Sequence, residues 1–496
     1  MHDGSGVMRA EDVAREHQFR EGFKLVDFGE VGLPIFRLTI EAITTSMRSI
    51  PTIQEFAMRC LALGENQEKP IARMLGLKED IICGAIDTLV SDGLVVRITV
   101  VGDHSSFSLT ALGEERLAQD AQEVVQEEML VIDYDAMRRK PIRLAGENVV
   151  RASELKAFGA VEIRPYPVEP PSVSDLAIPE ISRAIRRRDG EDFRRNVLAL
   201  KQIVRRNNVF REAVALVFAA ERGSEVQVAF VLDGKLSESH ERAFAENGGP
   251  RKMGFIRKIG EHSTRQGLQR LIGRESFAAM PNSMMMKDAL KEEAESRSQV
   301  RSIALAVDSN RTRRTLNPAT PALEAAQERF ALAKHALDTM DIRPLACFEQ
   351  DELLEEAISS ARRSLIVTSA GLQPTILTQH VLRDLENLVA GRVAVDIGSF
   401  LRPQNEPRGG AYYDPLSELT KRAQAGRMNL HRTRRSAFFY LIKDDDLAVI
   451  SNRPMLGDVV RRTSFQKVEG VITRDTRRVN DIRELAAKVC GVKKNG

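Results

Sequence analysis

The C-terminal third of the chain constrains the fold most, because short apolar runs alternate there with amphipathic segments. Runs such as Ser364–Ser369 and Leu447–Ser451 have the length and composition of buried strands. The pattern predicts strands at 364–369, 392–397, 428–433, 437–442, 447–451 and 467–473, and helices at 352–363, 374–390, 415–425 and 476–489. Strands and helices that alternate in this way predict a layered α/β domain over residues 345–496.

A second pattern lies between residues 50 and 120. Apolar residues recur at helical spacing over 52–63, 71–75 and 78–91, and Gly64 and Gly76 follow the first two segments. The turn Asp92-Gly93 leads into a predicted strand at 94–100, a second strand follows at 107–110, and a closing helix is expected over 111–125. This order of three helices and a hairpin resembles the winged helix-turn-helix domain of bacterial and archaeal regulators. The resemblance implies DNA binding, with the third helix in the major groove.

Charge separates this region from the rest of the chain. Residues 1–130 contain 12 Lys and Arg against 22 Asp and Glu, a net charge of −10, whereas residues 131–496 contain 61 against 48, a net charge of +13. The predicted third helix has Lys78 but also Glu79, Asp80, Asp87 and Asp92. Because DNA affinity depends on cations that neutralise phosphates, two interpretations stay open: a protein-docking module and a DNA reader.

Four segments follow from these patterns. We expect a winged helix with an N-terminal arm at 1–130, a connector at 131–174, a basic α+β middle module at 175–344 and the layered domain at 345–496. The connector ends in a proline-rich stretch, and the middle module has arginine-rich predicted helices at 178–187 and 193–206 and a strand at 225–232. The predicted fold class is therefore multidomain α/β.

The C-terminal domain resembles the phospholipase-D-like domain in its element order. The family motif is His-x-Lys, then Asp after four residues, then Gly-Ser-x-Asn after six more, and later a strand near a Glu-Gly pair. Asp444 and Glu469-Gly470 match it, and Ser451 matches when the gap is one residue shorter, with Arg453 then in the Asn position. The His and Lys positions hold Ala437 and Phe439, and no His-x-Lys pair occurs anywhere in the chain.

The missing residues exclude the family's reaction. Its chemistry requires a histidine nucleophile and a Lys and Asn that bind phosphate oxygens. Arginines surround the motif, and arginine is well suited to phosphate. We therefore expect a degenerate, non-catalytic domain that binds nucleic-acid backbone, DNA rather than RNA, through Arg432, Arg434, Arg435, Arg453, Arg461 and Arg462. The alternative is that these arginines lie on solvated faces and pair with Asp444, Asp445 and Asp446.

Other features predict no cofactor and no metal. Cys60, Cys83, Cys347 and Cys490 have no zinc-ligand spacing, and no Walker A sequence is present. Asp233-Gly234-Lys235 follows a predicted strand; it fits a hairpin turn, although an acid and a lysine also occur in metal-dependent nucleases. No apolar run has the composition of a membrane span or a secretory signal, so we expect a cytoplasmic protein without membrane contact.

These observations lead to one functional hypothesis and two alternatives. We expect a non-catalytic DNA-binding or scaffold subunit of a prokaryotic DNA-processing or anti-phage defence complex, with a protein partner at the acidic winged helix and homodimerisation as a further expectation. The first alternative is a transcriptional regulator that joins a winged helix to a phospholipase-D-like sensor. The second is a metal-dependent nuclease that uses Asp233 and Lys235.

Overall fold

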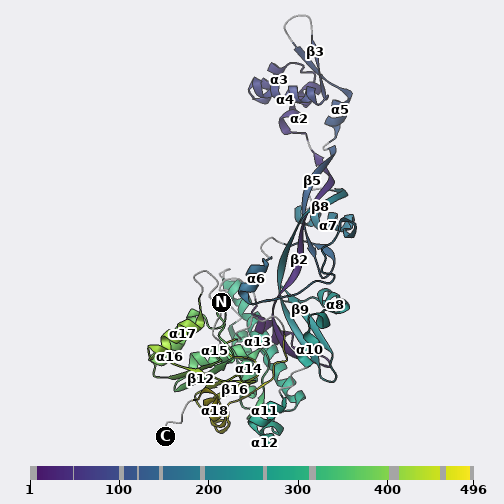
Figure 1. Ribbon diagram of the computed structural model, residues 1–496. Helices are drawn as coiled ribbons and strands as arrows, with labels where there is room; N and C mark the ends of the chain where they lie inside the picture. The colour runs from purple at the N-terminus through teal and green to yellow at the C-terminus, as the bar shows by residue number, and fades with distance from the viewer. Residues whose placement is uncertain are drawn as a thin grey trace. The chain divides into compact units, whose positions relative to one another are not determined.

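The computed structural model describes residues 8–48, 50–99, 105–119, 122–144, 149–189, 196–260, 265–311, 320–400, 413–457 and 465–491. The chain forms two compact units, and neither is a continuous stretch of sequence (Figure 1). Unit 1 contains residues 1–34, 148–168 and 209–496, and unit 2 contains residues 35–147 and 169–208. The chain therefore crosses between the two units four times.

A seven-stranded sheet forms the centre of unit 1. Its strand order is β11-β17-β16-β15-β12-β13-β14. The strands are β11 (Arg343–Pro344), β12 (Ser364–Ser369), β13 (Ala394–Ser399), β14 (Asn429–Arg432), β15 (Phe439–Lys443), β16 (Leu447–Ser451) and β17 (Gly470–Thr473). β12, β13 and β14 run parallel, and β15 is antiparallel to β12. Every strand predicted for this domain is present, although several ends differ by a few residues.

Helices cover both faces of this sheet. Alternate residues of a strand point to opposite faces, so Leu365 and Val367 face one core and Ile366 faces the other. The first core lies under α15 (Glu349–Ser360), α16 (Gln379–Ala390) and α17 (Pro415–Gln424). The second lies under α18 (Thr476–Cys490) and α11 (Arg265–Ile272). A mixed α/β architecture is thereby confirmed for this region.

The N-terminal arm packs on the C-terminal domain. The arm consists of α1 (Ala10–Glu16), β1 (Phe19–Arg20) and the start of β2 (Phe23–Arg48). Val13 and Phe28 of the arm share a core with Phe348 and with Phe218 and Val231. The last two belong to β8 (Asn196–Ala220) and β9 (Val226–Leu232), which precede the C-terminal domain in sequence. Segments from three predicted domains thus bury apolar surface together.

The remaining elements of unit 1 are short apart from two helices that pack against each other, α13 (Ser283–Arg311) and α14 (Thr320–Asp338). α13 includes the polar segment that begins at Met284. The short elements are α6 (Ala152–Phe158), β7 (Val161–Glu162), β10 (Lys235–Leu236), α8 (Glu238–Glu246), α9 (Gly249–Lys252), α10 (Phe255–Gly260) and α12 (Arg274–Ala278).

Long strands form the base of unit 2. β2 pairs with β5 (Gln122–Asp135) in antiparallel register from Ile35↔Asp135 to Arg48↔Gln122. β6 (Lys140–Ile142) pairs with the end of β5, and β8 lies beside β2. On one face, Leu38 and Leu130 pack against Ile181 of α7 (Ile178–Asp189), which follows the short helix η2 (Val173–Asp175).

The winged-helix elements are an insertion between β2 and β5. They are α2 (Thr52–Ala62), α3 (Glu68–Leu75), α4 (Glu79–Ser91), β3 (Val95–Thr99), β4 (Ser105–Leu109) and α5 (Ala111–Ala118). Met58, Ile71, Ile82 and Phe107 meet in their core. Gly76 ends α3 with φ of 69°, a left-handed conformation that glycine adopts without strain. The predicted order of three helices and a hairpin is confirmed.

One predicted helix is wrong and another is shorter than predicted. The helix predicted at 193–206 is strand from Asn196 onward, because β8 pairs in the sheet beside β2 and this pairing outweighs local helix propensity. The helix predicted over 111–125 ends at Ala118, and Gln122 begins β5. There, β-branched Val124 and Val125 lie opposite Ser46 and Thr45 of β2.

The predicted segment boundaries do not coincide with the compact units. The boundary at 130/131 falls inside β5, and the predicted connector contains β6, α6 and β7. The boundary at 344/345 comes immediately after β11, which pairs with β17 of the C-terminal domain. The four-segment division remains a prediction.

Candidate nucleic-acid interface

The residues of the degenerate motif meet at one edge of the seven-stranded sheet. Parallel strands end at the same edge, so Ser399 of β13 and Arg432 of β14 are neighbours there. β15 runs the other way and begins at this edge with Phe439, which pairs with Ser451 at the end of β16. We call this the carboxyl edge. It brings Arg432, Ala437, Phe439 and Ser451 together.

Asp444 lies at the opposite edge. It occupies the turn between β15 and β16, with φ of 44°, and is buried. Its carboxylate accepts backbone hydrogen bonds from Arg362, Arg363 and Ser364 at 2.8, 2.6 and 2.8 Å. Burial alone would raise the pKa of Asp444, but these donors and Lys443 hold it below its ordinary value. Asp444 therefore anchors the start of β12 and has a structural role.

Phe439, which occupies the position of the family's lysine, is part of the hydrophobic core. Phe439 is 7% exposed and belongs to the same apolar cluster as Met455, Leu456 and Leu441. Ser451 is fully buried, and its Oγ accepts a hydrogen bond from the backbone N–H of Arg453 at 3.0 Å. Ala437 is exposed but has no group that can attack phosphorus. His431, the nearest histidine in sequence, is 2.7 Å from the Asp396 carboxylate through Nε2.

Arg432, Arg434 and Arg435 are the cations that remain free at the carboxyl edge. All three are exposed, and none has a side-chain hydrogen bond or ion pair with another residue that the structure describes. These arginines are solvent-exposed, as the alternative expected, but among the described residues they do not pair with Asp444, Asp445 or Asp446. Asp444 binds backbone N–H groups, Asp445 pairs with Arg363, and Asp446 pairs with Lys443. Free, exposed guanidinium groups are available to phosphate oxygens.

Arg453 is placed differently from these three. Its Nη1 donates to the carbonyl of Cys347 at 3.5 Å, and its guanidinium lies 5.7 Å from the centre of the Phe28 ring. Burial disfavours its charge, but the carboxylates of Asp351 and Asp27 outweigh this effect and raise the pKa of Arg453. The positive charge of Arg453 is thus stabilised by carboxylates of its own chain. Arg461 and Arg462 lie outside the described residues.

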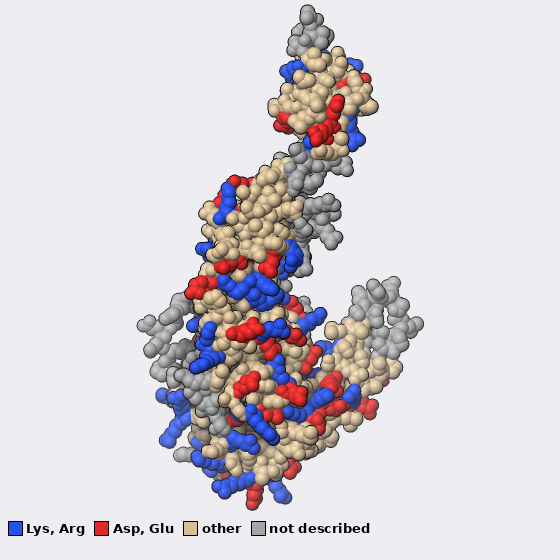
Figure 2. Space-filling view, turned by 90° about the vertical axis from the view of Figure 1, so that its right-hand side faces the viewer, with Lys and Arg blue, Asp and Glu red and all other residues tan. Residues whose placement is uncertain are grey.

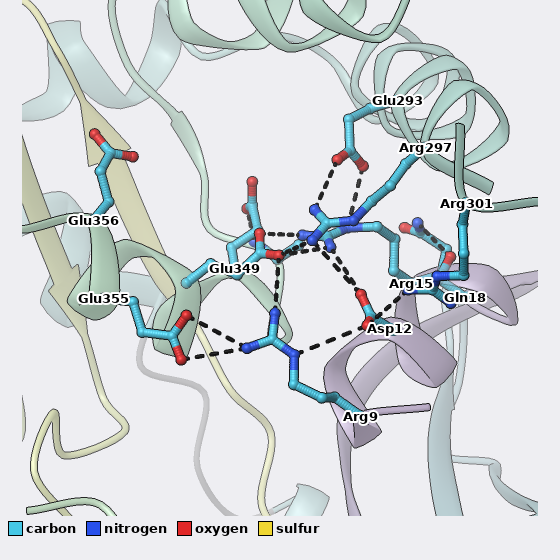
Figure 3. A network of polar contacts seen from close by, with 12 residues as sticks. Arg9, Asp12, Arg15, Gln18, Glu293, Arg297, Arg301, Glu349, Glu355 and Glu356 are labelled. Atoms are coloured by element: carbon cyan, nitrogen blue, oxygen red, sulfur yellow. Dashed lines mark hydrogen bonds and ion pairs between the residues drawn. The ribbon is translucent and has the colours of Figure 1, made fainter. Parts of the chain in front are cut away.

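A second charged cluster joins α1, α13 and α15, and the sequence analysis missed it (Figure 3). Arg15 is 4% exposed; its guanidinium contacts Glu352 at 3.0 and 2.6 Å and Glu293 at 3.1 Å. Arg297 pairs with Glu352 as well, and Arg301 pairs with Asp12 at 2.7 Å. Burial alone would raise the pKa of Glu352, but the two arginines lower it to about 2.

These side chains line a cavity of about 500 Å³. Arg343 and Arg474 also line it, and each is held by a glutamate through two hydrogen bonds, Arg343 by Glu349 and Arg474 by Glu356. Because the buried arginines are paired with carboxylates, the cluster fastens the arm to the domain rather than presenting free cations to a ligand. Arginines spaced four apart at 297 and 301, and acids at 349, 352 and 356, are the sequence signals that could have indicated it.

The third helix of the winged helix is acidic at its surface. Glu79, Asp80 and Asp87 of α4 are exposed. Two nearby basic residues already form ion pairs: Arg97 pairs with Asp87 at 2.6 Å, and Lys69 lies 3.8 Å from Glu79. Large apolar side chains are exposed on α2, just after it and on α3: Phe56 by 48%, Leu63 by 76% and Met74 by 61%. The exposed carboxylates of α4 disfavour contact with phosphates.

Asp233-Gly234 forms the hairpin turn between β9 and β10. Both residues have positive φ, 49° and 75°, and Leu232 pairs with Lys235. The exposed Asp233 carboxylate accepts a hydrogen bond from Arg211 at 2.6 Å. Within the described ranges, no three His, Cys, Asp or Glu side chains are grouped so that they could hold a metal ion. None of the described helices has the length and hydropathy that crossing a bilayer requires.

No family model matches the sequence, and no curated protein matches it. Solved structures are similar to parts of it. TrmBL2, an archaeal chromatin protein with a novel mode of DNA binding, is 17% identical over 33% of this chain and 58% of its own, with a TM-score of 0.22. NUC from Salmonella typhimurium, a phospholipase D family member, is 15% identical over 28% of this chain and 84% of its own, with a TM-score of 0.21. NucT from Helicobacter pylori is 12% identical over 30% of this chain and 95% of its own, with a TM-score of 0.22.

Proposed function

We propose that this protein is a non-catalytic nucleic-acid-associated subunit that holds DNA by its phosphate backbone. The observation that carries the proposal is the carboxyl edge, where Phe439 is buried in the core and Arg432, Arg434 and Arg435 remain exposed and unpaired among the described residues. An edge with arginines and no nucleophile can bind phosphodiesters without cleaving them. This chemistry suits a DNA-processing or anti-phage defence complex in which another subunit acts on the DNA.

We assign the winged helix to a protein partner within this proposal. Its exposed α4 carboxylates would repel phosphates, whereas the exposed Phe56, Leu63 and Met74 offer apolar area that a partner can bury. A regulator that reads a defined DNA sequence through α4 is the alternative. It requires tight, sequence-selective binding that depends on α4.

Duplex binding at two salt concentrations tests the proposal. A labelled mixed-sequence duplex should bind with an affinity that falls steeply between about 50 and 200 mM salt, and no strand cleavage should appear with or without Mg²⁺. Joint reversal of Arg432, Arg434 and Arg435 to Glu should weaken binding at least about tenfold and reduce the salt slope by about 2 to 3. Arg362→Glu is the matched control, because this exposed arginine lies at the opposite edge of the same sheet.

Three outcomes would contradict the proposal. An unchanged affinity in the triple variant would remove the carboxyl edge from the interface. Sequence-selective binding that depends on α4 would favour the regulator. Metal-dependent cleavage that Asp233→Ala abolishes would favour the nuclease.

A further inference from the structure

One short helix, α11, packs directly beside the carboxyl edge. Gly267 of α11 lies so close to the Phe438 ring, just before β15, that a Cβ there would be 2.8 Å from a ring carbon. Leu268 shares a core with Phe438 and with Val479 of α18. α11 is therefore fixed next to the segment that contains Arg434 and Arg435, only a few residues before Phe438.

α12, which follows α11 in the chain, contacts the start of α18. Arg478 donates a hydrogen bond from Nη1 to Ser276 Oγ of α12, and Phe277 packs against the core that includes Val479. Asp475 caps α18 by accepting from the Arg478 backbone N–H at 3.0 Å. In Figure 1, α11, α12 and α18 lie together at the base of the seven-stranded sheet. These contacts join three separate parts of the sequence into one surface.

The outward side chains of this surface are mainly arginines. Arg270, Arg274 and Arg477 are exposed, and none is paired with another residue in the described part of the chain. Arg265 is also exposed and stacks 5.2 Å from the centre of the Phe277 ring. The exposed acids on the same elements are Glu275, Asp481 and Glu484. Figure 2 shows that blue side chains also gather along the lower margin of the face it displays.

We propose that α11, α12 and the first turn of α18 form, with the carboxyl edge, one duplex-binding surface that runs from this edge across one face of the sheet toward the opposite edge, where β17 ends and α18 begins. On this surface Arg270, Arg274 and Arg477 contact phosphates. The inference rests on the proposed function. It adds three arginines to the interface and specifies a duplex, not a single strand, as the ligand. Planar guanidinium groups bind phosphate oxygens in pairs and can follow a backbone without reading bases. A single strand would require exposed aromatic rings on which bases stack, but Phe438 is 9% exposed and Phe277 is covered by Arg265.

Binding assays on the full-length protein separate this inference from the proposed function. The probes are a labelled mixed-sequence duplex and one of its strands. Joint reversal of Arg270, Arg274 and Arg477 to Glu should weaken duplex binding at least about fivefold and lower the salt slope. The same three positions changed to Gln should give a smaller loss in the same direction. Circular dichroism and melting curves check folding, and Arg73→Glu is the control, because this exposed arginine of α3 lies outside the proposed surface.

Each result supports or overturns one of the two claims. If the wild-type protein binds neither probe, the proposed function fails. If duplex binding depends on Arg432, Arg434 and Arg435 but not on Arg270, Arg274 and Arg477, the function stands and the inference is wrong. Tighter binding of the single strand than of the duplex also overturns the inference. A loss in both triple variants supports one continuous surface.

Discussion

At the scale of single residues, two carboxyl groups meet where the arm contacts the C-terminal domain. Glu11 of α1 lies within hydrogen-bonding reach of Asp351 of α15. Burial, followed by the Asp351 carboxylate, raises the pKa of Glu11 to about 7. Folding therefore takes up a proton at this position between the ordinary glutamate pKa and neutral pH. The contact favours the folded state at acidic pH, and this contribution is lost as the pH rises through about 7.

Glu11→Gln should remove this dependence. A glutamine resembles the protonated acid, so the variant should be more stable than the wild type at pH 8, on the order of 1 kcal/mol, and similar to it at pH 5. Urea denaturation at several pH values measures the effect. Glu16→Gln is the control, because Glu16 is exposed on the same helix. The prediction would be contradicted if the free energy of unfolding varied with pH in the same way for the wild type and for Glu11→Gln.

At the scale of elements, α1 is held against α13 and α15 by Arg15. This helix has only seven residues, too few to be stable alone, so its position depends on tertiary contacts. The Arg15 guanidinium pairs with Glu352 and Glu293 and lies 5.0 Å from the centre of the Phe348 ring. The Glu293 side chain is 8% exposed and that of Glu352 is 26% exposed, so the first is shielded from water and the second partly so. Both carboxylates are stabilised by Arg15, with Arg297 as a second cationic partner.

Arg15→Met keeps much of the side-chain volume but removes the charge. It should destabilise unit 1 by about 3 kcal/mol at pH 7, because one shielded and one partly shielded carboxylate lose a partner. The pKa of Glu352 is depressed, so its contribution is present above the ordinary glutamate pKa and disappears as the pH falls toward 2. The loss of unfolding free energy caused by Arg15→Met should therefore be smaller at pH 3 to 4 than at pH 7. Denaturation curves for this variant and for Arg9→Met, whose arginine is more exposed, test the claim. An equal cost at both pH values would contradict it.

At the scale of the whole molecule, the winged helix is an insertion, not a terminal domain. The inserted segment begins after Arg48, at the end of β2, and ends before Gln122, at the start of β5. Arg48 and Gln122 are paired with each other in the sheet. Deletion of residues 1–130 would remove α1, β2 and most of β5, and with them parts of two cores. Replacement of residues 49–121 by Asn-Gly instead closes β2 and β5 into a two-residue hairpin.

This excision removes eleven acidic and six basic residues, a net charge of −5. Duplex affinity should stay the same or rise by a few fold, since the removed charge repels phosphate. Co-purification with a protein partner should be lost. Electrophoretic shift assays and pull-downs from the native host measure the two effects. The full chain with Asp87→Lys is the control for charge alone. Loss of duplex binding after a correctly folded excision would show that the winged helix reads DNA.

Elements whose pattern is local could be predicted from the order of residues alone. Apolar spacing and turn residues located the strands of the C-terminal sheet, the winged-helix order and the turn at Asp233-Gly234. The substitutions at Ala437 and Phe439 excluded the nucleophile, because side-chain chemistry requires no coordinates.

Other features of the molecule depend on long-range contacts. Strand pairing made 196–206 part of β8 although its arginine-rich sequence suits a helix, and packing of distant segments joined the arm to α13 and α15. Long-range contacts also separated Arg453, which is held among carboxylates, from Arg432, Arg434 and Arg435, which remain exposed. These outcomes depend on which segments meet across the fold, and local residue spacing does not record that pairing.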